Sequence, residues 1–351
     1  MDIKNLLQQT VELKASDLHL VAGVSPTVRI DGELFSLPNS QVLTPDLIAE
    51  SLKTILSDEQ FQKLSANKEL DFSISFSEIS RFRVNAYTQK GSFAVAFRGI
   101  PLELPDVSAL GLPKIVHNFT TLRQGLILIT GPTGHGKSTT LAAILNEINK
   151  NRSVHIVTIE DPVEFVFKPI KSIISQREMG SDTHSWPVAL RSVLREDPDV
   201  VLVGEMRDHE TIAAALTVAE TGHLVFATLH TNSAAQTIDR IVDVFPEEQQ
   251  SQIRMQLSLV LEAAFSQRLV AANTKGRVVA HEVMLGSSAI KTAIREGKSH
   301  QIDSIIQTSQ EIGMSTLEKS LAELVKAGKI TIEIAQSWSI RPEELSRLVR
   351  S

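Results

Sequence analysis

The residues from 131 to 138 read Gly-Pro-Thr-Gly-His-Gly-Lys-Ser and follow directly on the apolar run 125–130. This is the complete pattern G-x-x-x-x-G-K-S/T, which joins a buried strand to a helix. Its glycines allow backbone N–H groups to surround phosphate oxygens, its lysine places a positive charge on them, and its serine hydroxyl can ligate Mg²⁺. The N-terminus of the helix that follows would face the same anion. The pattern therefore predicts an α/β fold that binds the phosphates of a nucleotide.

The nucleotide is expected to be ATP with Mg²⁺. A GTPase would carry an N-K-x-D segment that reads the base, and the nearest stretch, residues 67–70, precedes the loop and lacks the aspartate. Ser138 is the candidate metal ligand within the loop. The candidate cofactor-binding residues are Gly131, Pro132, Thr133, Gly134, His135, Gly136, Lys137, Ser138 and Thr139.

Composition excludes several other classes of protein. A net charge of −6 and a single tyrosine leave no basic stripe with aromatic platforms for a nucleic acid. No apolar run approaches the length of a membrane span, and the opening residues are too polar for a signal peptide. The chain has no cysteine, so it has neither disulfides nor a Cys₄ zinc site. We therefore expect a cytoplasmic protein with no integral membrane segment.

The first part of the chain, residues 1–98, is expected to form a small α+β domain. Its strands alternate between apolar and polar residues, most clearly at 81–87, where Phe82, Val84 and Ala86 would share one face. Asp31-Gly32 is a hairpin turn signal. The expected helices are 2–14 and 45–64, and the other strand-like stretches are 17–20, 27–30 and 72–76. Residues 99–113, rich in proline and glycine, are expected to be a linker.

From residue 114 onward, short apolar runs alternate with helical patterns. Runs that are apolar throughout are typical of parallel strands covered on both faces. We therefore expect a nucleotide-binding core over residues 114–270 and a helical subdomain over residues 271–351. The longest expected helix, 247–270, lies at the end of the core. The expected core strands are 126–130, 154–159, 200–203 and 224–228.

Two of these apolar runs end in carboxylates. Glu160 and Asp161 follow the run 154–159, and Glu205 lies two residues after the run 200–203. An ATPase needs one carboxylate to orient or deprotonate water and one to help hold Mg²⁺. Because P-loop chemistry takes place at the carboxyl ends of the strands, Glu160 and Glu205 are the catalytic candidates. Glu160 is also a candidate metal ligand, and Asp161 is a further candidate.

Histidines stand on both sides of the strand 224–228. At the carboxyl end of a core strand, His230 could hydrogen-bond a γ-phosphate, and we treat it as a catalytic candidate. His223 is a weaker candidate. As a metal-binding pair the two are poor, because they lie seven residues apart across a strand with no cysteine nearby.

Arginines could supply the remaining positive charge. Arg81 and Arg83 share one face of a strand in the first domain, outside the P-loop domain. Such a pair could complete a neighbouring subunit's site as arginine fingers, which would require a ring. The further candidates are Arg191 and Arg195, four residues apart on one helical pattern, together with Arg207 and Arg240.

The order of these motifs resembles that of the ATPases of type II secretion and type IV pili, most closely the PilT family of pilus retraction ATPases. The matching segments cover nearly the whole chain. They are an N-terminal 15–20, an arginine segment 81–85, the phosphate loop 131–138, an aspartate box 158–165, an atypical Walker B segment 194–208 and a histidine box 220–231.

The resemblance implies a homohexamer whose subunits carry a PAS-like N-terminal domain and a RecA-like ATPase domain. It places ATP between the two domains, with arginines of the N-terminal domain reaching it. By analogy Glu205 is the catalytic base, Glu160 supports Mg²⁺ and water, and His230 senses the γ-phosphate. The family's motor turns an inner-membrane platform protein (PilC-like) at the pilus base and depolymerises pilin.

Within the superfamily, the resemblance favours the retraction branch, because extension motors and type II secretion ATPases carry a tetracysteine zinc insertion. Three alternatives remain: an accessory PilU-like retraction ATPase, which would work with a second retraction ATPase, a type II secretion ATPase, and a RecA-like ring that moves nucleic acid. The chain departs from the family at Lys291, Thr292 and Ala293, where the family has Arg-Asn-Leu. It also carries His135 where serine is usual, a position at which we expect tolerance.

Overall fold

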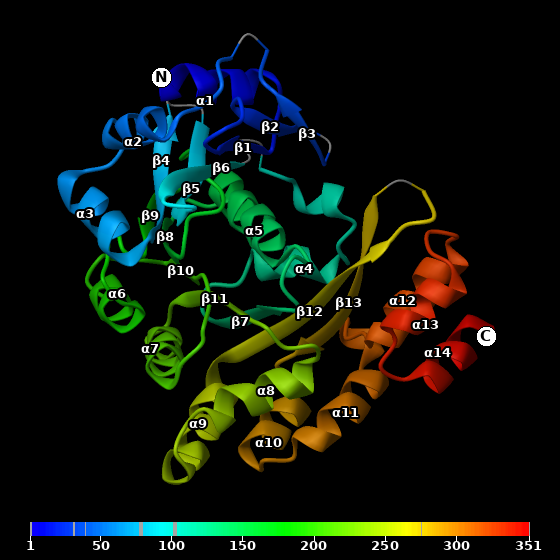
Figure 1. Ribbon diagram of the computed structural model, residues 1–351. Coiled ribbons are helices and arrows are strands. Elements are labelled where there is room, and N and C mark those ends of the chain that lie inside the picture. Colours follow the sequence, from blue (N-terminus) through cyan, green and yellow to red (C-terminus); the bar gives the residue numbers. More distant parts are fainter. Residues whose placement is uncertain are drawn as a thin grey trace. The chain divides into compact units, whose positions relative to one another are not determined.

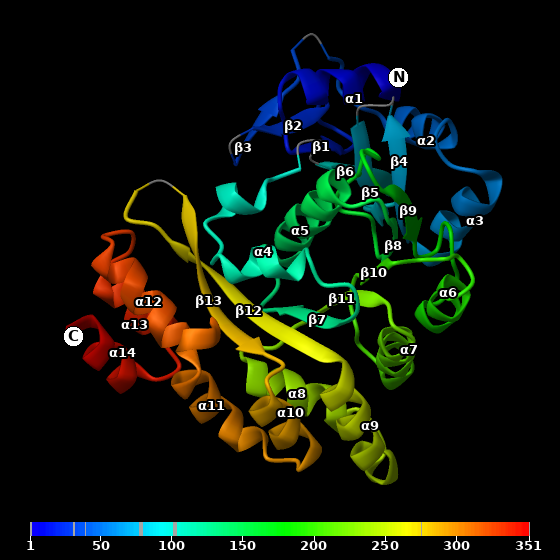
Figure 2. The ribbon, with the colours of Figure 1, turned by 180° about the vertical axis from the view of Figure 1, so that it is seen from behind.

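The computed structural model describes residues 2–30, 32–38, 40–76, 80–100, 104–274 and 276–350. By its internal contacts the chain divides into two compact units. The first comprises residues 1–103 with the short segment Glu164–Val166, and the second comprises the remainder from Leu104 onward. Each unit contains one sheet, and Figures 1 and 2 show both from opposite sides.

The first unit is an antiparallel sheet in the order β3-β2-β1-β6-β5-β4, against which its helices pack. Phe82, Val84 and Ala86 of β5, which lies between β6 and β4, are buried on one face, as the alternation predicted. The elements are α1 Ile3–Glu12, β1 Asp17–Leu20, β2 Thr27–Ile30, β3 Glu33–Ser36, α2 Pro45–Lys53, α3 Asp58–Asn67, β4 Glu69–Phe76, β5 Ser80–Gln89 and β6 Ser92–Ile100.

Two sequence-based expectations for this unit were wrong. The single helix over 45–64 is two helices, because Ser57 starts a new one with a capping box to Gln60. Gly99 and Ile100, expected in a linker, are the last residues of β6, which pairs along its whole length with β5. Asp31 of the expected turn lies outside the described residues, although β2 and β3 on either side of it do pair.

The second unit contains a seven-stranded sheet in the order β13-β12-β7-β11-β10-β8-β9. The strands from β12 to β9 in this order are parallel, and β13 is antiparallel to β12. Every residue of β7, β10 and β11 is buried, as the uniformly apolar runs predicted. The strands are β7 Gly125–Thr130, β8 His155–Glu160, β9 Ile173–Glu178, β10 Val200–Val203, β11 Leu224–Leu229, β12 Leu261–Ala271 and β13 Arg277–Leu285.

The expected helix over 247–270 was wrong in its second half. Helix α9 ends at Val260, and the next residues form β12, which lies between β7 and β13. The stretch is rich in alanine, leucine and glutamine, which favour helices in isolation. Hydrogen bonding to two neighbouring strands outweighs this preference, because Ala263, Ala264 and Phe265 become fully buried in the sheet.

Helices cover the second sheet and form the C-terminal part of the unit. Helices α12, α13 and α14 enclose a small apolar core of their own against β12 and β13, as Figures 1 and 2 show. The helices are α4 Ile115–Phe119, α5 Lys137–Asn151, α6 Trp186–Val193, α7 His209–Glu220, α8 Ala234–Asp243, α9 Glu247–Val260, α10 Ser288–Arg295, α11 Ile302–Thr308, α12 Leu317–Lys326, α13 Ile332–Trp338 and α14 Pro342–Arg350. Among the described residues, no helix is long and apolar enough to cross a bilayer.

Candidate functional site

The phosphate-binding loop lies between β7 and α5 and is shaped by its glycines. Gly131 has φ +141°, and a Cβ there would lie 2.3 Å from the carbonyl oxygen of Gln267. Gly136 has φ +83° and forms the N-terminal boundary of α5. Only glycine fits both positions without strain. The loop therefore presents the N-terminus of a 15-residue helix, where backbone N–H groups favour an anion.

Lys137, the first residue of α5, points back across this loop. Its side chain is buried, and its ammonium group donates to the carbonyl oxygens of Gly131 at 2.8 Å and Pro132 at 3.0 Å. Its Nζ also lies 3.4 Å from Nδ1 of His230. The positive charge is thus held at the centre of the loop, where it can contact phosphate oxygens.

Glu205 and His230 form a hydrogen-bonded pair beside the phosphate loop. Nε2 of His230 lies 3.1 Å from Oε1 of Glu205, and Nη2 of Arg207 lies 2.7 Å from the other carboxylate oxygen. Gly204, which precedes Glu205, packs closely against the end of β8, because a Cβ there would lie 3.1 Å from the carbonyl oxygen of Ile159. The carboxyl ends of β10 and β11, neighbours in the sheet, therefore bring the pair together.

The contacts of His230 define which of its nitrogens carries the proton. Nδ1 lies 3.2 Å from the hydroxyl of Thr133 and close to the Lys137 ammonium, which can only donate. Nδ1 is therefore the acceptor, and we assign the proton to Nε2, which donates to Glu205. The imidazole connects the carboxylate to the phosphate loop.

The environment of Glu205 favours its ionised form. Partial burial raises the pKa of this carboxyl, but the hydrogen bond and charge of Arg207 and the nearby His230 outweigh the burial. The pKa of Glu205 is consequently lowered from its ordinary value. At neutral pH the group is a carboxylate, with 21 % of its side chain exposed to solvent. It can accept a proton or orient a water molecule.

Glu160 ends the neighbouring strand β8 and is more deeply buried than Glu205. Its Oε1 accepts hydrogen bonds from the hydroxyl of Thr158 at 2.6 Å and from the amide of Gln176 at 3.2 Å. These two contacts fix the orientation of the carboxylate. Asp161 follows immediately, at the carboxyl edge of the sheet.

The donor set at this edge fits Mg²⁺. In the part of the chain that the structure describes, no three His, Asp or Glu side chains cluster as metal ligands. Mg²⁺ does not require such a cluster, since it usually keeps several waters and takes one or two protein oxygens together with phosphates. The Ser138 hydroxyl and the Glu160 carboxylate are the oxygens that would hold it.

Several predicted residues lie away from this group. His223 is at the amino end of β11, where its Nδ1 contacts Thr221 and the carbonyl of Val218, at the opposite edge of the sheet. Arg191 and Arg195 are exposed on and just after α6, and Arg240 is exposed near the end of α8. The structure does not bring these four residues to the phosphate loop.

Arg81 and Arg83 lie in the other unit, two residues apart on β5. Nη2 of Arg81 donates to the hydroxyl of Ser73 on the neighbouring strand at 2.7 Å, and Arg83 is exposed. Both side chains stand on the face opposite to the buried Phe82, as the alternation predicted.

The sequence analysis did not identify Gln267 of β12, which hydrogen-bonds the phosphate loop and the first turn of α5. Its amide oxygen accepts from the hydroxyl of Thr140 at 2.8 Å, and its amide nitrogen donates to the carbonyl oxygen of His135 at 2.7 Å. The side chain is almost fully buried. No motif marks this residue, and the segment was expected to be helical, so its contact with the loop had no local signal.

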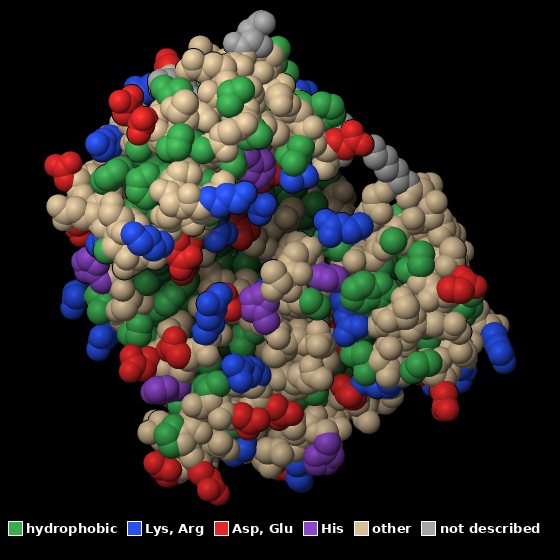
Figure 3. Space-filling model, in the orientation of Figure 1, with side chains coloured by type: hydrophobic (Ala, Val, Ile, Leu, Met, Phe, Trp, Pro, Cys, Tyr) green, Lys and Arg blue, Asp and Glu red, His purple; other side chains and the backbone are tan. Residues whose placement is uncertain are grey.

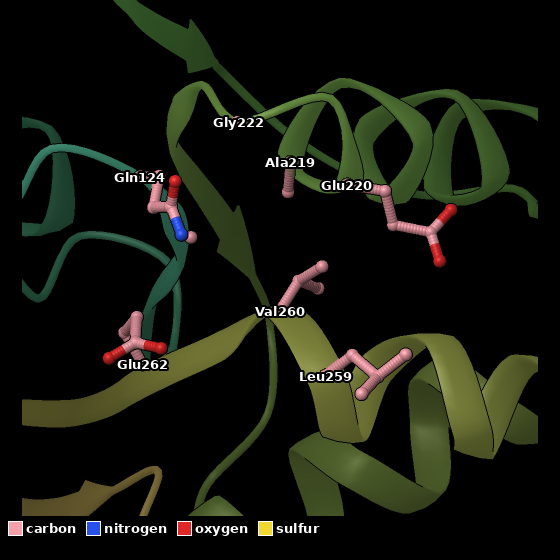
Figure 4. A pocket seen from close by; sticks show the side chains of 8 residues that line it. Gln124, Ala219, Glu220, Gly222, Leu259, Val260 and Glu262 are labelled. Atoms are coloured by element: carbon pink, nitrogen blue, oxygen red, sulfur yellow. The ribbon is translucent and has the colours of Figure 1, made fainter.

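A separate cavity of about 320 Å³ opens at the amino edge of the same sheet. Figure 4 shows Gln124, Glu220 and Glu262 around it, with Leu259 of α9 on one side. Because β7 and β11 begin here and the phosphate loop follows the end of β7, this cavity is not part of the phosphate site.

On the face drawn in Figure 3, positive and negative side chains are interspersed.

Comparisons with known proteins agree with this geometry. The family model described as type II/IV secretion system protein matches residues 1–337. The type IV pilus retraction ATPase PilT of Pseudomonas aeruginosa is 47% identical, over 98% of this chain and 99% of the relative. A twitching motility protein of Neisseria gonorrhoeae is 44% identical, over 93% and 87% of the two chains.

Solved structures agree as well. The crystal structure of the pilus retraction motor PilT with bound ADP matches with a TM-score of 0.92 and 47% identity, covering 99% of each chain. The ATPase DotB of Legionella pneumophila matches with a TM-score of 0.85 and 27% identity, covering 95% of this chain and 94% of that one.

Proposed function

The chain belongs to the type II/IV secretion system protein family, and within it to the pilus retraction ATPases, and we propose that it works as a hexameric ring at the base of a pilus. It is an ATP-hydrolysing enzyme that powers retraction of type IV pili. The observation that carries this assignment is 47% identity to PilT over 98% of this chain, together with a complete phosphate loop beside the Glu205–His230 pair.

The chemistry follows from the residues at the phosphate loop. We propose that the residues from Gly131 to Thr139 bind the phosphates and that Lys137 neutralises their charge. Glu205, ionised and in contact with His230, would orient or deprotonate the attacking water. His230, which links Glu205 to the loop, would contact the γ-phosphate. When bound, Mg²⁺ would neutralise phosphate charge, and Ser138 and Glu160 are the residues proposed to hold it.

We propose the hexameric ring because the chain belongs to a family that resembles hexameric motors. In it, Arg81 and Arg83 of the first domain would reach the nucleotide as arginine fingers. The expected boundaries at 98 and 270 fall within β6 and β12, and the part expected to be helical, 271–351, contains β13. We propose that the first unit, which extends to Glu103, moves against the second unit during the cycle. The partner would be an inner-membrane platform protein of the pilus machine, so the protein would act in the cytoplasm, peripheral to that membrane.

We propose a second retraction ATPase as a companion, since the family also contains the type IV pilus ATPase PilU of Pseudomonas aeruginosa, which is 37% identical over the whole of this chain. The accessory role itself remains the alternative assignment. The ability of the purified chain to drive retraction without a companion distinguishes the two roles.

The ring and the active site can be tested together. Mass photometry of the full chain, with and without ATP and Mg²⁺, is run beside steady-state phosphate release for the wild type and Lys137→Ala. We expect a hexamer whose hydrolysis disappears in the variant, because the charge on the phosphates is lost. A stable monomer with full activity would overturn the ring, and unchanged hydrolysis in Lys137→Ala would overturn the site.

A further inference from the structure

His135 lies in the phosphate loop, and its imidazole contacts both β12 and the C-terminal helices. Nδ1 accepts a hydrogen bond from the backbone N–H of Leu269 at 2.9 Å. The parallel pairing of β12 with β7 ends at Ser266 opposite Thr130, just where the loop begins. The imidazole therefore satisfies an N–H of β12 beyond the end of β7 and attaches the loop to that strand.

The other side of the same ring meets the C-terminal helices. The rings of His135 and Trp338, the last residue of α13, contact each other edge to face, with centroids 5.3 Å apart and planes at 69°. Trp338 also packs against the apolar core of α12–α14. Helix α13 contacts β12 within the second unit. Loop and C-terminal core thus share one aromatic contact.

Arg268 connects Trp338 to a second part of the site. One guanidinium nitrogen donates to the carbonyl oxygen of Trp338, and the other donates to that of Asn232 at 3.2 Å. Asn232 follows His230 by two residues, in the loop after β11. Arg268 is 9 % exposed, so both hydrogen bonds are made in a largely dry environment, where losing either is costly.

Charge around His135 keeps its ring neutral, which the contact to Leu269 requires. Burial lowers the pKa of this imidazole, and the positive charges of Arg277, Lys137 and Arg268 lower it further. A neutral ring retains the lone pair on Nδ1 that accepts the backbone N–H. The bond to β12 is therefore present at neutral pH.

We propose that His135, Arg268 and Trp338 form a junction that positions the phosphate loop and the loop after β11 relative to each other. In this scheme, the C-terminal helices set the affinity of the site for nucleotide. His135 and Trp338 are positioning residues, since both act through the loop. The proposal rests on the assignment of this loop as the nucleotide site.

The first test separates binding from turnover. In His135→Ser the shorter side chain does not reach Leu269, and we expect KM for ATP and Kd for fluorescent ADP to rise about fivefold, as for one lost hydrogen bond. The factor by which KM rises should exceed the factor by which kcat falls, which is the split expected of a positioning residue. His135→Asn, which keeps an acceptor, should recover part of the affinity. Equal affinity in His135→Ser and the wild type would overturn the proposal.

The second test measures coupling across the junction. Trp338→Leu should weaken ADP binding in the wild-type background and have little further effect beside His135→Ser, because both changes break the same contact. Ile334→Ala, in the same helix and core but outside the junction, is the matched control. It should lower thermal stability and leave Kd unchanged.

The outcomes separate the two proposals. Strictly additive effects of His135→Ser and Trp338→Leu, or an equal loss of affinity in Ile334→Ala, would reduce the junction to ordinary packing. If the wild-type chain itself neither binds ADP nor hydrolyses ATP, the proposed function fails instead. Measurements on the full chain decide between these results.

Discussion

Two sides of the phosphate loop each contain a histidine, and the two histidines make different contacts. We call the side formed by Glu205, Arg207 and His230 the β10 and β11 flank, and the side formed by His135, Gln267 and Arg268 the β12 flank. His230, on the flank of β10 and β11, is part-exposed and sits in a line of charges from Arg207 through Glu205 to Lys137. His135, on the flank of β12, makes a neutral hydrogen bond to backbone and an aromatic contact.

This difference indicates that one side of the loop carries out catalysis and the other side holds the loop in position. On the β10 and β11 flank, ionisable groups lie within hydrogen-bond distance of one another, so a proton or water can be handled there. On the β12 flank, amide, backbone and aromatic contacts fix where the loop stands. Substitutions on the first flank should therefore change turnover, and substitutions on the second should change affinity or stability.

The largest effect is expected on the charged flank. Glu205→Gln removes the carboxylate that orients or deprotonates water, and kcat should fall by about 10²–10⁴ with ADP affinity nearly unchanged. Single-turnover hydrolysis and fluorescent ADP binding measure the two quantities. Glu160→Gln is the comparison variant, and a larger loss of kcat in it than in Glu205→Gln would reverse the roles of the two carboxylates.

The next effect tests the β12 flank by steric means. Gly131→Ala places a methyl group against the carbonyl oxygen of Gln267 in a backbone conformation that alanine rarely adopts, so the loop must shift. We expect nucleotide affinity to fall by about 5- to 150-fold, as for 1–3 kcal/mol of strain. Isothermal titration with ADP, alongside circular dichroism to verify folding, measures this. Undiminished affinity would show that the close contact does not constrain the loop.

A smaller effect on turnover is expected for His230. His230→Asn breaks the contact with Glu205, and kcat should fall about tenfold, as for one hydrogen bond to a charged group. ADP has no γ-phosphate, so its Kd should remain within twofold of the wild type. If Kd for ADP rises by as large a factor as kcat falls, His230 positions the loop as His135 does, and the contrast between the two flanks is wrong.

The smallest effect on activity, with a clear effect on stability, is expected for Glu282 of β13. Burial raises the pKa of this carboxyl to about 7. A raised pKa contributes stability at pH values below 4.5 that is lost as the pH rises through 7. Relative to Glu282→Gln, which stays neutral, the wild type should lose about 3 kcal/mol of unfolding free energy between pH 4 and pH 8. Urea unfolding at several pH values measures the slope, and parallel curves would contradict it.

The charged flank was predictable from sequence and the β12 flank was not. Lys137, Glu205 and His230 each follow a short apolar run, so their place at the carboxyl edge could be deduced from neighbouring residues. Their mutual contacts confirm that they lie together. Their catalytic roles remain predictions.

The contacts of β12 depend on residues far apart in the chain. Gln267 and Arg268 lie in a stretch of helix-forming residues, and only pairing with β7 and β13 makes it a strand. Tolerance was expected at His135 because the loop's pattern leaves that position open, and nothing near it in sequence predicts Leu269 or Trp338 as partners. Long-range pairing of this kind is not encoded in local periodicity.

The place of β12 between β7 and β13 has a consequence for the order in which the chain folds on the ribosome. Thr130 hydrogen-bonds Ser266, 136 residues later in the sequence. Contacts of such separation form late, because a long loop must close first. A nascent chain therefore carries the whole phosphate-binding pattern long before the partners of that pattern are synthesised. The phosphate loop can therefore take up its final geometry only after Leu269 has been synthesised.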